Sequence, residues 1–229
     1  ARDSNLVLPI HCGPEIGVAS TKAFLGQMLV LYMLCLKLSF DQKIITKKTY
    51  QEKIKNLLAL SNLCKKTLLT DSKIQKASKA FIKAKGSMFL GRGYSFPIAL
   101  EGALKLKELA YVHAEGYPAG EMKHGPLALI EEGMPVVVLA PRDNHYKKTI
   151  SNMQEVIARG AKVLLITNKS KDEIQSENIW EKIEVENLTE DLFPFLITVP
   201  LQKLAYYSAL QNGYDIDKPR NLAKSVTVE

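Results

Sequence analysis

The chain has 229 residues, of which 46% are hydrophobic and 24% charged, a composition typical of a soluble globular protein with one or two domains. Its net charge of +7 is local, because residues 43–85 hold twelve lysines against two acidic residues and carry +10, which leaves −3 for the rest of the chain. This stretch has a helical rhythm and few aromatic residues, so we interpret it as a solvated helix face and expect no nucleic-acid partner.

The cysteines and the hydropathy pattern favour a cytoplasmic protein. Cys12, Cys35 and Cys64 follow neither a disulfide nor a metal-ligand spacing, and the sequence does not open with the charged and apolar regions of a signal peptide. The longest apolar run, residues 29–36, is shorter than the roughly 20 residues that a membrane-spanning helix requires. We therefore expect a reducing compartment and no membrane role.

The first 85 residues predict the end of one α/β unit followed by a helical connector. Residues 6–10 indicate a short strand that ends at a Gly-Pro turn, and a helix follows over about 20–38. Two lysine-rich helices are expected over 42–69 and 71–85, separated by cap-type residues. The chain thus opens on the last strand and helix of a unit that begins outside it.

From residue 86 onward, short apolar segments alternate with helical ones. The predicted strands cover 87–90, 134–139, 162–167 and 182–185, and the predicted helices cover 95–112, 145–159 and 191–212. This alternation predicts an α/β fold in which helices cover both faces of a parallel sheet. The remaining residues, 213–229, show no periodicity and predict a tail.

A charged cluster lies on the helix predicted over 95–112. Glu101, Lys105 and Glu108 are four and three residues apart, so they fall within an arc of roughly 60° with apolar neighbours. One interpretation is a pair of ordinary helix salt bridges. The other is a carboxylate base tuned by a lysine in a crevice at the carboxyl edge of the sheet, with Glu108 nearest the ligand. The spacing alone leaves both open.

The segment 120–126 is dense in titratable groups and turn residues. His124 precedes a Gly-Pro pair and can exchange a proton near neutral pH, so it is a candidate general acid or base. A surface histidine without a role is the alternative. The other three histidines add no metal-ligand spacing around it, and we expect no metal site.

Two further segments are candidates for a site. In the tail, Lys224 becomes a competent imine-forming amine if docking through Val226 and Val228 holds it away from water; a solvated terminal lysine is the alternative. Before the first helix, Ser20 is placed to cap that helix and leave its amide groups facing a crevice. Capping alone also explains Ser20.

Four stretches match one known family: residues 13–24, 90–93 with 99–108, 120–128 and 219–229. They resemble the isomerase half of the glutamine:fructose-6-phosphate aminotransferase family nearly from end to end. The first three stretches are also typical of other sugar isomerase (SIS) domain proteins, whereas the ending NLAKSVTVE is specific to this family.

The resemblance implies two SIS domains of similar topology, each with a five-stranded parallel sheet in a three-layer αβα arrangement, followed by a tail that reaches into the active site. We therefore expect the end of the first SIS domain at 1–40, a helical connector at 41–70, the second SIS domain at 71–212 and the active-site tail at 213–229.

The resemblance also implies an activity: the conversion of fructose 6-phosphate and ammonia from glutamine into glucosamine 6-phosphate, without a cofactor. Lys224 corresponds to the lysine that forms an imine with the open-chain ketose, and Glu108 to the base that moves a proton between C1 and C2. Lys105 matches a residue beside that base. His124 matches a histidine that assists ring opening from the partner subunit of a homodimer. Three more positions match residues that line the sugar: Val18, Ser20 and Ala223.

The chain departs from the family in two respects. It lacks the N-terminal cysteine that hydrolyses glutamine in this family, and it lacks the Ser/Thr-rich loop that grips the sugar phosphate. We expect a glutaminase domain in the intact protein and no activity from these 229 residues alone. The alternatives are another SIS-domain phosphosugar isomerase or deglycase, which the tail disfavours, and a noncatalytic phosphosugar-sensing module, which has no need of Glu108 and Lys224 together.

Overall fold

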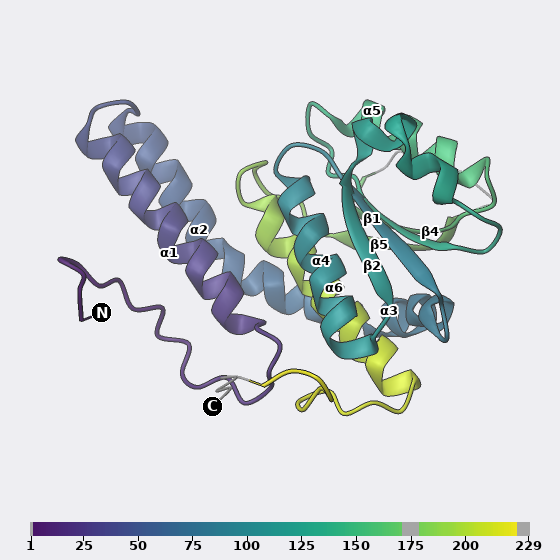
Figure 1. Ribbon diagram of the computed structural model, residues 1–229. Coiled ribbons are helices and arrows are strands. Elements are labelled where there is room, and N and C mark those ends of the chain that lie inside the picture. The colour runs from purple at the N-terminus through teal and green to yellow at the C-terminus, as the bar shows by residue number, and fades with distance from the viewer. Residues whose placement is uncertain (1, 171–178, 224–229) are drawn as a thin grey trace.

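A five-stranded parallel sheet forms the centre of the protein (Figure 1). The computed structural model describes residues 2–170 and 179–223. In the sheet the strands follow the order β2-β1-β3-β4-β5. Their bounds are β1 (Gly86–Gly91), β2 (His113–Pro118), β3 (Pro135–Leu139), β4 (Lys162–Asn168) and β5 (Ile179–Val185). The parallel sheet that the alternating pattern predicted is confirmed.

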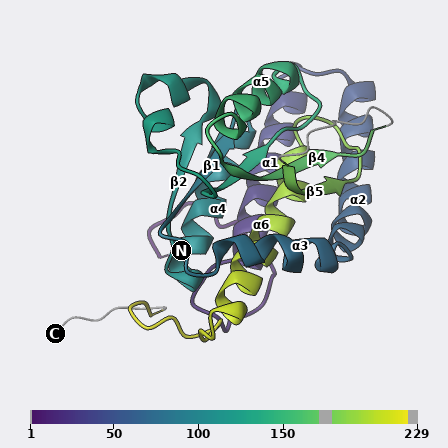
Figure 2. The same cartoon turned by 90° about the vertical axis from the view of Figure 1, so that its right-hand side faces the viewer.

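Helices cover both faces of the sheet, as Figure 2 shows. One face carries α3 (Asp71–Ser78), α4 (Ser95–Ala110) and α6 (Phe193–Gln211), and the other carries α5 (Tyr146–Ile157) with the 3₁₀ segments η2 (Ala119–His124) and η3 (Pro126–Leu129). A further short segment, η1 (Lys79–Phe81), follows α3. The result is the three-layer αβα arrangement that the resemblance implied.

The central strand β3 shows why both faces need a covering layer. All five of its residues are buried. Because successive side chains of a strand point to opposite faces, Val137 and Leu139 join the core under α4 and α6, whereas Val136 and Val138 join the core under α5. A strand with this sequence would expose valines to water if either helical layer were missing.

Two strand predictions differ from the structure. Residues 6–10 form no strand; they lie largely exposed, and Ile10 packs against Gly26. A strand needs a neighbour for its backbone hydrogen bonds, and within the described part of the chain none lies beside this segment. Conversely, β2 was not predicted, because its sequence HAEGYP is poor in β-branched residues. It pairs with β1 alone, and such an edge position tolerates its proline.

The helices α1 (Lys22–Asp41) and α2 (Lys47–Leu68) project from the sheet domain as a pair (Figure 1). With 20 residues and a mean hydropathy of 1.7, α1 meets the length and composition of a membrane-spanning helix, properties that the core helix of a soluble protein shares. The helix as a whole is therefore more apolar than the run 29–36 indicated.

A polar contact fixes this helical pair to the sheet domain. Asp191, which precedes α6, accepts a 2.5 Å hydrogen bond from the Tyr32 hydroxyl of α1 and forms an ion pair with Lys53 of α2. Burial and the neighbouring Asp191 carboxylate raise the pKa of the Tyr32 hydroxyl. One carboxylate thus joins three helices.

We predict that Gly116→Ala destabilises the fold. A Cβ at this position of β2 would lie 2.9 Å from backbone atoms of Leu100 in α4, so the edge strand and the helix must separate. The free energy of unfolding should fall by about 1–3 kcal/mol, as urea titration would measure it. Gly86→Ala on β1 is the matched control, because the nearest atom to its Cβ lies at an ordinary 3.5 Å. Equal losses in both variants would contradict the prediction.

Candidate active site

A buried ammonium group lies between two carboxylates on α4. The side chain of Lys105 is 3% exposed, and its Nζ lies 2.6 Å from Oε2 of Glu108 and 3.5 Å from Oε1 of Glu101. The side chain of Glu108 is 21% exposed and that of Glu101 is 11% exposed. Ordinary surface salt bridges have no such burial, so the structure removes that interpretation of the cluster.

Burial acts most strongly on Glu101. It raises the pKa of the Glu101 carboxyl above the usual 4.5, and the Lys105 ammonium only partly offsets this effect. The neighbouring Glu108 carboxylate raises the pKa of the Glu101 carboxyl as well, because the single ammonium group of Lys105 lies between the two carboxylates.

The cluster lies toward the amino edge of the sheet. The expected position at the carboxyl edge is therefore wrong for Lys105 and Glu108. A helix that links two parallel strands runs antiparallel to them. Accordingly α4 begins after the carboxyl end of β1 and ends three residues before His113, the first residue of β2. Lys105 and Glu108 occupy the last two turns and therefore lie near the start of the strands.

The loop before α1 is held by Glu15 and not by the predicted Ser20 cap. Oε1 of Glu15 accepts hydrogen bonds from the backbone N–H of Thr21 at 2.6 Å and of Ala23 at 3.3 Å. A carboxylate at this point satisfies unpaired amide groups and complements the positive end of the helix dipole. Ala19, inside the loop, is buried in the core beneath α4 and α6. No local spacing rule links Glu15 to a helix that begins seven residues further on.

The tail returns to this loop and to the end of α4. The backbone N–H of Val18 donates to the carbonyl of Asp217 at 3.0 Å, and the N–H of Arg220 donates to the hydroxyl of Tyr111 at 2.8 Å. Figure 1 shows the tail passing from the end of α6 to the loop before α1. Of the predicted sugar-lining residues, Val18 and Ser20 are half-buried in the loop and Ala223 is exposed on the tail. Lys224, Val226 and Val228 lie outside the described residues.

A hollow of about 350 Å³ lies where these segments meet. Its walls come from the loop before α1, the end of α4, α6 and the tail: Pro14, Glu15, Ile16, Gly17, Ala19, Thr21, Lys22, Leu109, Gln202, Tyr206, Ile216 and Asp217. Leu109 is the residue after Glu108. The structure thus brings the first stretch, 13–24, beside residues near the ends of two others, Leu109 and Asp217, whereas Glu101, Lys105 and Glu108 do not line this hollow.

The fourth stretch lies apart within this chain. His124 ends η2, which follows the carboxyl end of β2, whereas Glu108 lies near the amino edge. Its side chain is 75% exposed, and its Nε2 lies 4.0 Å from Oε2 of Glu121. His124 therefore does not lie beside the α4 cluster of the same chain. That His124 acts in the active site of a partner subunit stays a prediction.

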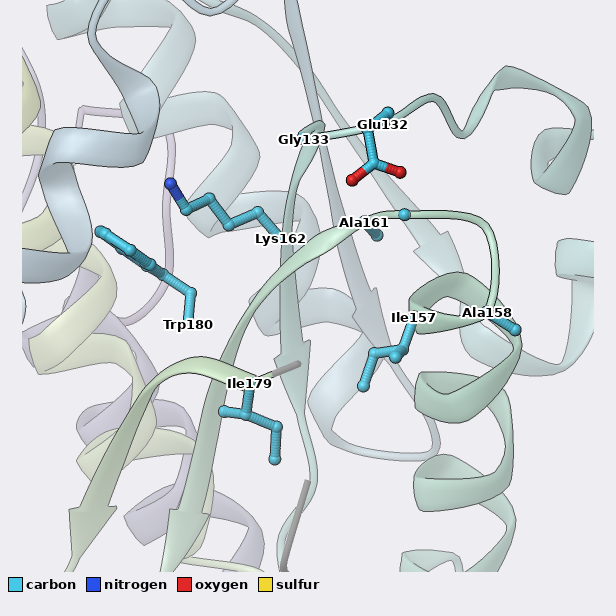
Figure 3. A pocket seen from close by; sticks show the side chains of 9 residues that line it. Glu132, Gly133, Ile157, Ala158, Ala161, Lys162, Ile179 and Trp180 are labelled. Atoms are coloured by element: carbon cyan, nitrogen blue, oxygen red, sulfur yellow. The ribbon is translucent and has the colours of Figure 1, made fainter. Parts of the chain in front are cut away.

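A second hollow, of about 670 Å³, opens at the amino ends of β4 and β5 (Figure 3). The Nζ of Lys162 lies 3.6 Å from the centroid of the Trp180 ring. Glu132 lies across the hollow from these two side chains (Figure 3). None of the predicted site residues lines it. Among residues 2–170 and 179–223, no three His, Cys, Asp or Glu side chains gather as a metal site.

The doubly covered five-stranded parallel sheet places the protein in a known class. The chain belongs to the SIS domain family, which matches residues 80–211. Within this class it is similar over its whole length to particular enzymes. It is 46% identical over 229 residues to the glutamine–fructose-6-phosphate aminotransferase (isomerizing) of Bartonella henselae and 51% identical over 220 residues, or 96% of the chain, to that of Bacteroides thetaiotaomicron. The chain spans 38% and 36% of the length of these two relatives.

Solved structures agree with this assignment. The C-terminal domain of glucosamine-fructose-6-phosphate aminotransferase from Francisella tularensis matches 90% of this chain and 58% of its own, with a TM-score of 0.87 and 41% identity. Glucosamine-6-phosphate deaminase from Thermotoga maritima has a TM-score of 0.64 and 24% identity over 94% of this chain and 59% of its own. The second likeness shows the fold alone.

We predict that Glu101→Gln gains stability relative to the wild type as the pH rises from about 4 to about 8. The raised pKa means that the wild-type carboxyl contributes most while protonated and loses this contribution as the pH rises through the folded-state value. Glutamine resembles the protonated acid and does not titrate. Urea unfolding at a series of pH values measures the difference. The exposed Glu131→Gln should show none, and a pH-independent difference for Glu101→Gln would contradict the assignment.

Proposed function

We propose that the chain is the C-terminal part of the isomerase portion of an enzyme that converts fructose 6-phosphate and glutamine-derived ammonia into glucosamine 6-phosphate. The observation that carries the proposal is the 46% identity over all 229 residues to an enzyme named for this activity. The closeness of the end of α4, the loop before α1 and the tail supports it, as does the ion pair of Glu108 with Lys105 on the same helix. The low identity to other SIS enzymes of known structure gives the alternatives no comparable support.

The proposal divides the chain into four parts. Residues 1–40 supply the end of a first SIS domain, 41–70 a helical connector, 71–212 the second SIS domain and 213–229 the active-site tail. The exposed apolar side chains of α1, such as Leu31 and Met33, fit a helix whose remaining neighbours belong to the first domain. The contact of Tyr32 with Asp191 fits packing against protein and not lipid.

In the proposed reaction, the amine of Lys224 attacks C2 of the open-chain ketose and water leaves, which gives an imine that acidifies the C1–H bonds. Ammonia then displaces the lysine amine, which frees Lys224 and leaves an ammonia-derived imine at C2. Glu108 moves a proton from C1 to C2 of this imine, which gives the 2-amino aldose. Its carboxylate is suited to this task because Lys105, 2.6 Å away, stabilises its charge and fixes its position in a largely buried setting. His124 of a partner subunit assists ring opening, and Val18, Ser20 and Ala223 line the sugar.

The proposal assigns the missing steps to other parts of a longer protein. A glutaminase domain supplies ammonia, and a first SIS domain grips the phosphate. We expect a cytoplasmic homodimer that needs no cofactor, and we expect these 229 residues alone to be inactive, because binding energy from the phosphate is needed to hold the substrate.

We predict that Glu108→Gln in the full-length enzyme lowers kcat by about 10²-fold or more and leaves KM for fructose 6-phosphate nearly unchanged, because the amide keeps the shape but cannot accept the proton. Steady-state formation of glucosamine 6-phosphate measures this. Glu131→Gln, exposed and outside the site, is the matched control and should retain wild-type kcat. An unchanged kcat in Glu108→Gln would remove this residue from the mechanism.

We predict that borohydride reduction of the full-length enzyme with fructose 6-phosphate leaves a hexitol adduct on Lys224, because an imine of this lysine is the intermediate. Peptide mass mapping locates the adduct. Lys224→Arg should abolish it together with the activity, whereas Lys218→Arg, which changes another lysine of the tail, should preserve both. An adduct on other lysines alone, or full activity in Lys224→Arg, would overturn the proposed mechanism.

A further inference from the structure

The residue that follows α4, Tyr111, has a backbone conformation that its side chain disfavours. Tyr111 has φ 56° and ψ 25°, which places it in the left-handed region. This conformation costs a residue with a Cβ about 1–2 kcal/mol, and helices commonly place glycine or asparagine at this position. A tyrosine persists there only where surrounding contacts hold it.

The contacts that hold Tyr111 come from the tail. Its ring lies 4.7 Å, centroid to centroid, from the ring of Tyr214. The guanidinium carbon of Arg220 lies 4.2 Å from the centroid of the Tyr111 ring, and the backbone N–H of Arg220 donates to the Tyr111 hydroxyl at 2.8 Å. We refer to Tyr111, Tyr214 and Arg220 as the Tyr111 cluster. It joins the end of α4 to a segment 109 residues later in the chain.

The same part of the tail is fixed on its other side by the loop before α1. Val18 donates its N–H to the carbonyl of Asp217, and Pro219, between Asp217 and Arg220, is buried. The tail therefore runs between a loop that carries a predicted sugar-lining residue and the end of the helix that carries Glu108. Removal of the Tyr111 ring takes away the aromatic surface against which this part of the tail rests.

We propose that Tyr111 is a positioning residue: its strained conformation aims the ring at Tyr214 and Arg220 and thereby fixes the tail relative to Glu108, three residues earlier on α4. The role assigned to Glu108 rests on the proposed function. The contact between Tyr111 and the tail does not, so the two can be tested apart. Tyr111 touches neither substrate nor reacting atoms in this proposal and acts through the tail.

The first test is amide hydrogen exchange of the 229-residue chain. Tyr111→Asn suits the left-handed conformation but lacks the ring, so exchange at Val18 and across residues 214–222 should accelerate by about 10-fold or more while residues 99–109 of α4 keep their protection. Tyr111→Phe keeps the ring and loses the acceptor, so acceleration should be confined to the Arg220 amide. Unchanged tail exchange in Tyr111→Asn would overturn the proposal.

The matched control is Lys43→Asn. Lys43 lies in the turn between α1 and α2 with φ 58°, so the substitution relieves the same kind of backbone strain far from the tail. It should leave tail exchange at the wild-type rate. Accelerated tail exchange in this control would show that strain relief alone loosens the tail, and would overturn the role of the Tyr111 ring.

The second test is turnover by the full-length protein. Tyr111→Asn should lower kcat by about 10-fold or more with a smaller change in KM and an unfolding temperature close to the wild type, and Tyr111→Phe should restore most of the loss. Wild-type kcat in Tyr111→Asn despite a loosened tail would overturn the positioning role. If the wild type itself forms no glucosamine 6-phosphate, the proposed function fails, and the exchange experiment still decides whether the Tyr111 cluster fixes the tail.

Discussion

The ammonium group of Lys105 is the buried charge on which the arrangement of the site depends. It is almost fully removed from water and is compensated by Glu101 and Glu108 on the same helix. Loss of one partner from a buried ion pair typically costs about 3–5 kcal/mol, because the remaining charge is left uncompensated. The last two turns of α4 are thus electrostatically coupled, and the carboxylate of Glu108 has a fixed neighbour and a fixed direction before any ligand arrives.

The position of this charge on a crossover helix places it near the amino edge of the sheet. The loop before α1 and the tail reach the same amino edge, and each is fixed by backbone hydrogen bonds: Val18 to Asp217, and Arg220 to the Tyr111 hydroxyl. Three segments that are far apart in sequence therefore meet around one end of α4. Both hydrogen bonds are donated by main-chain N–H groups, and one of them is accepted by the Tyr111 side chain.

A separate set of side-chain contacts holds the segment at the carboxyl edge. Nη2 of Arg92 donates to Oδ1 of Asn152 at 2.8 Å, and its guanidinium lies against Gly120, where a Cβ would come within 2.7 Å of Nη2. Lys123 forms a 3.0 Å ion pair with Glu155 of α5. These contacts hold η2 firmly while His124, at its end, points into solvent. A rigid loop with an exposed histidine suits the proposed service to a partner subunit.

The elements and side-chain clusters that could be predicted from the sequence are those that have a local sequence pattern. The strand β3 and the helix α4 are marked by buried apolar runs and by charge spacing, and both were found where they were expected. The cap by Glu15 and the contacts of Tyr111 were not predictable, because they join residues with no fixed spacing, in the second case 109 positions apart. The cluster on α4 was predicted at the wrong edge of the sheet, because the prediction followed the general rule that α/β folds bind ligands at the carboxyl edge. It did not take into account that α4 runs antiparallel to the strands.

The most direct test is a crystal structure of the full-length protein with bound glucosamine 6-phosphate. We expect density for the sugar at the amino edge of this sheet, with C1 or C2 within about 3–4 Å of the Glu108 carboxylate and the sugar in contact with the loop that contains Val18 and with the tail. Density instead at the carboxyl edge, around Arg92 and Asn152, with Glu108 remote from the sugar, would contradict this expectation.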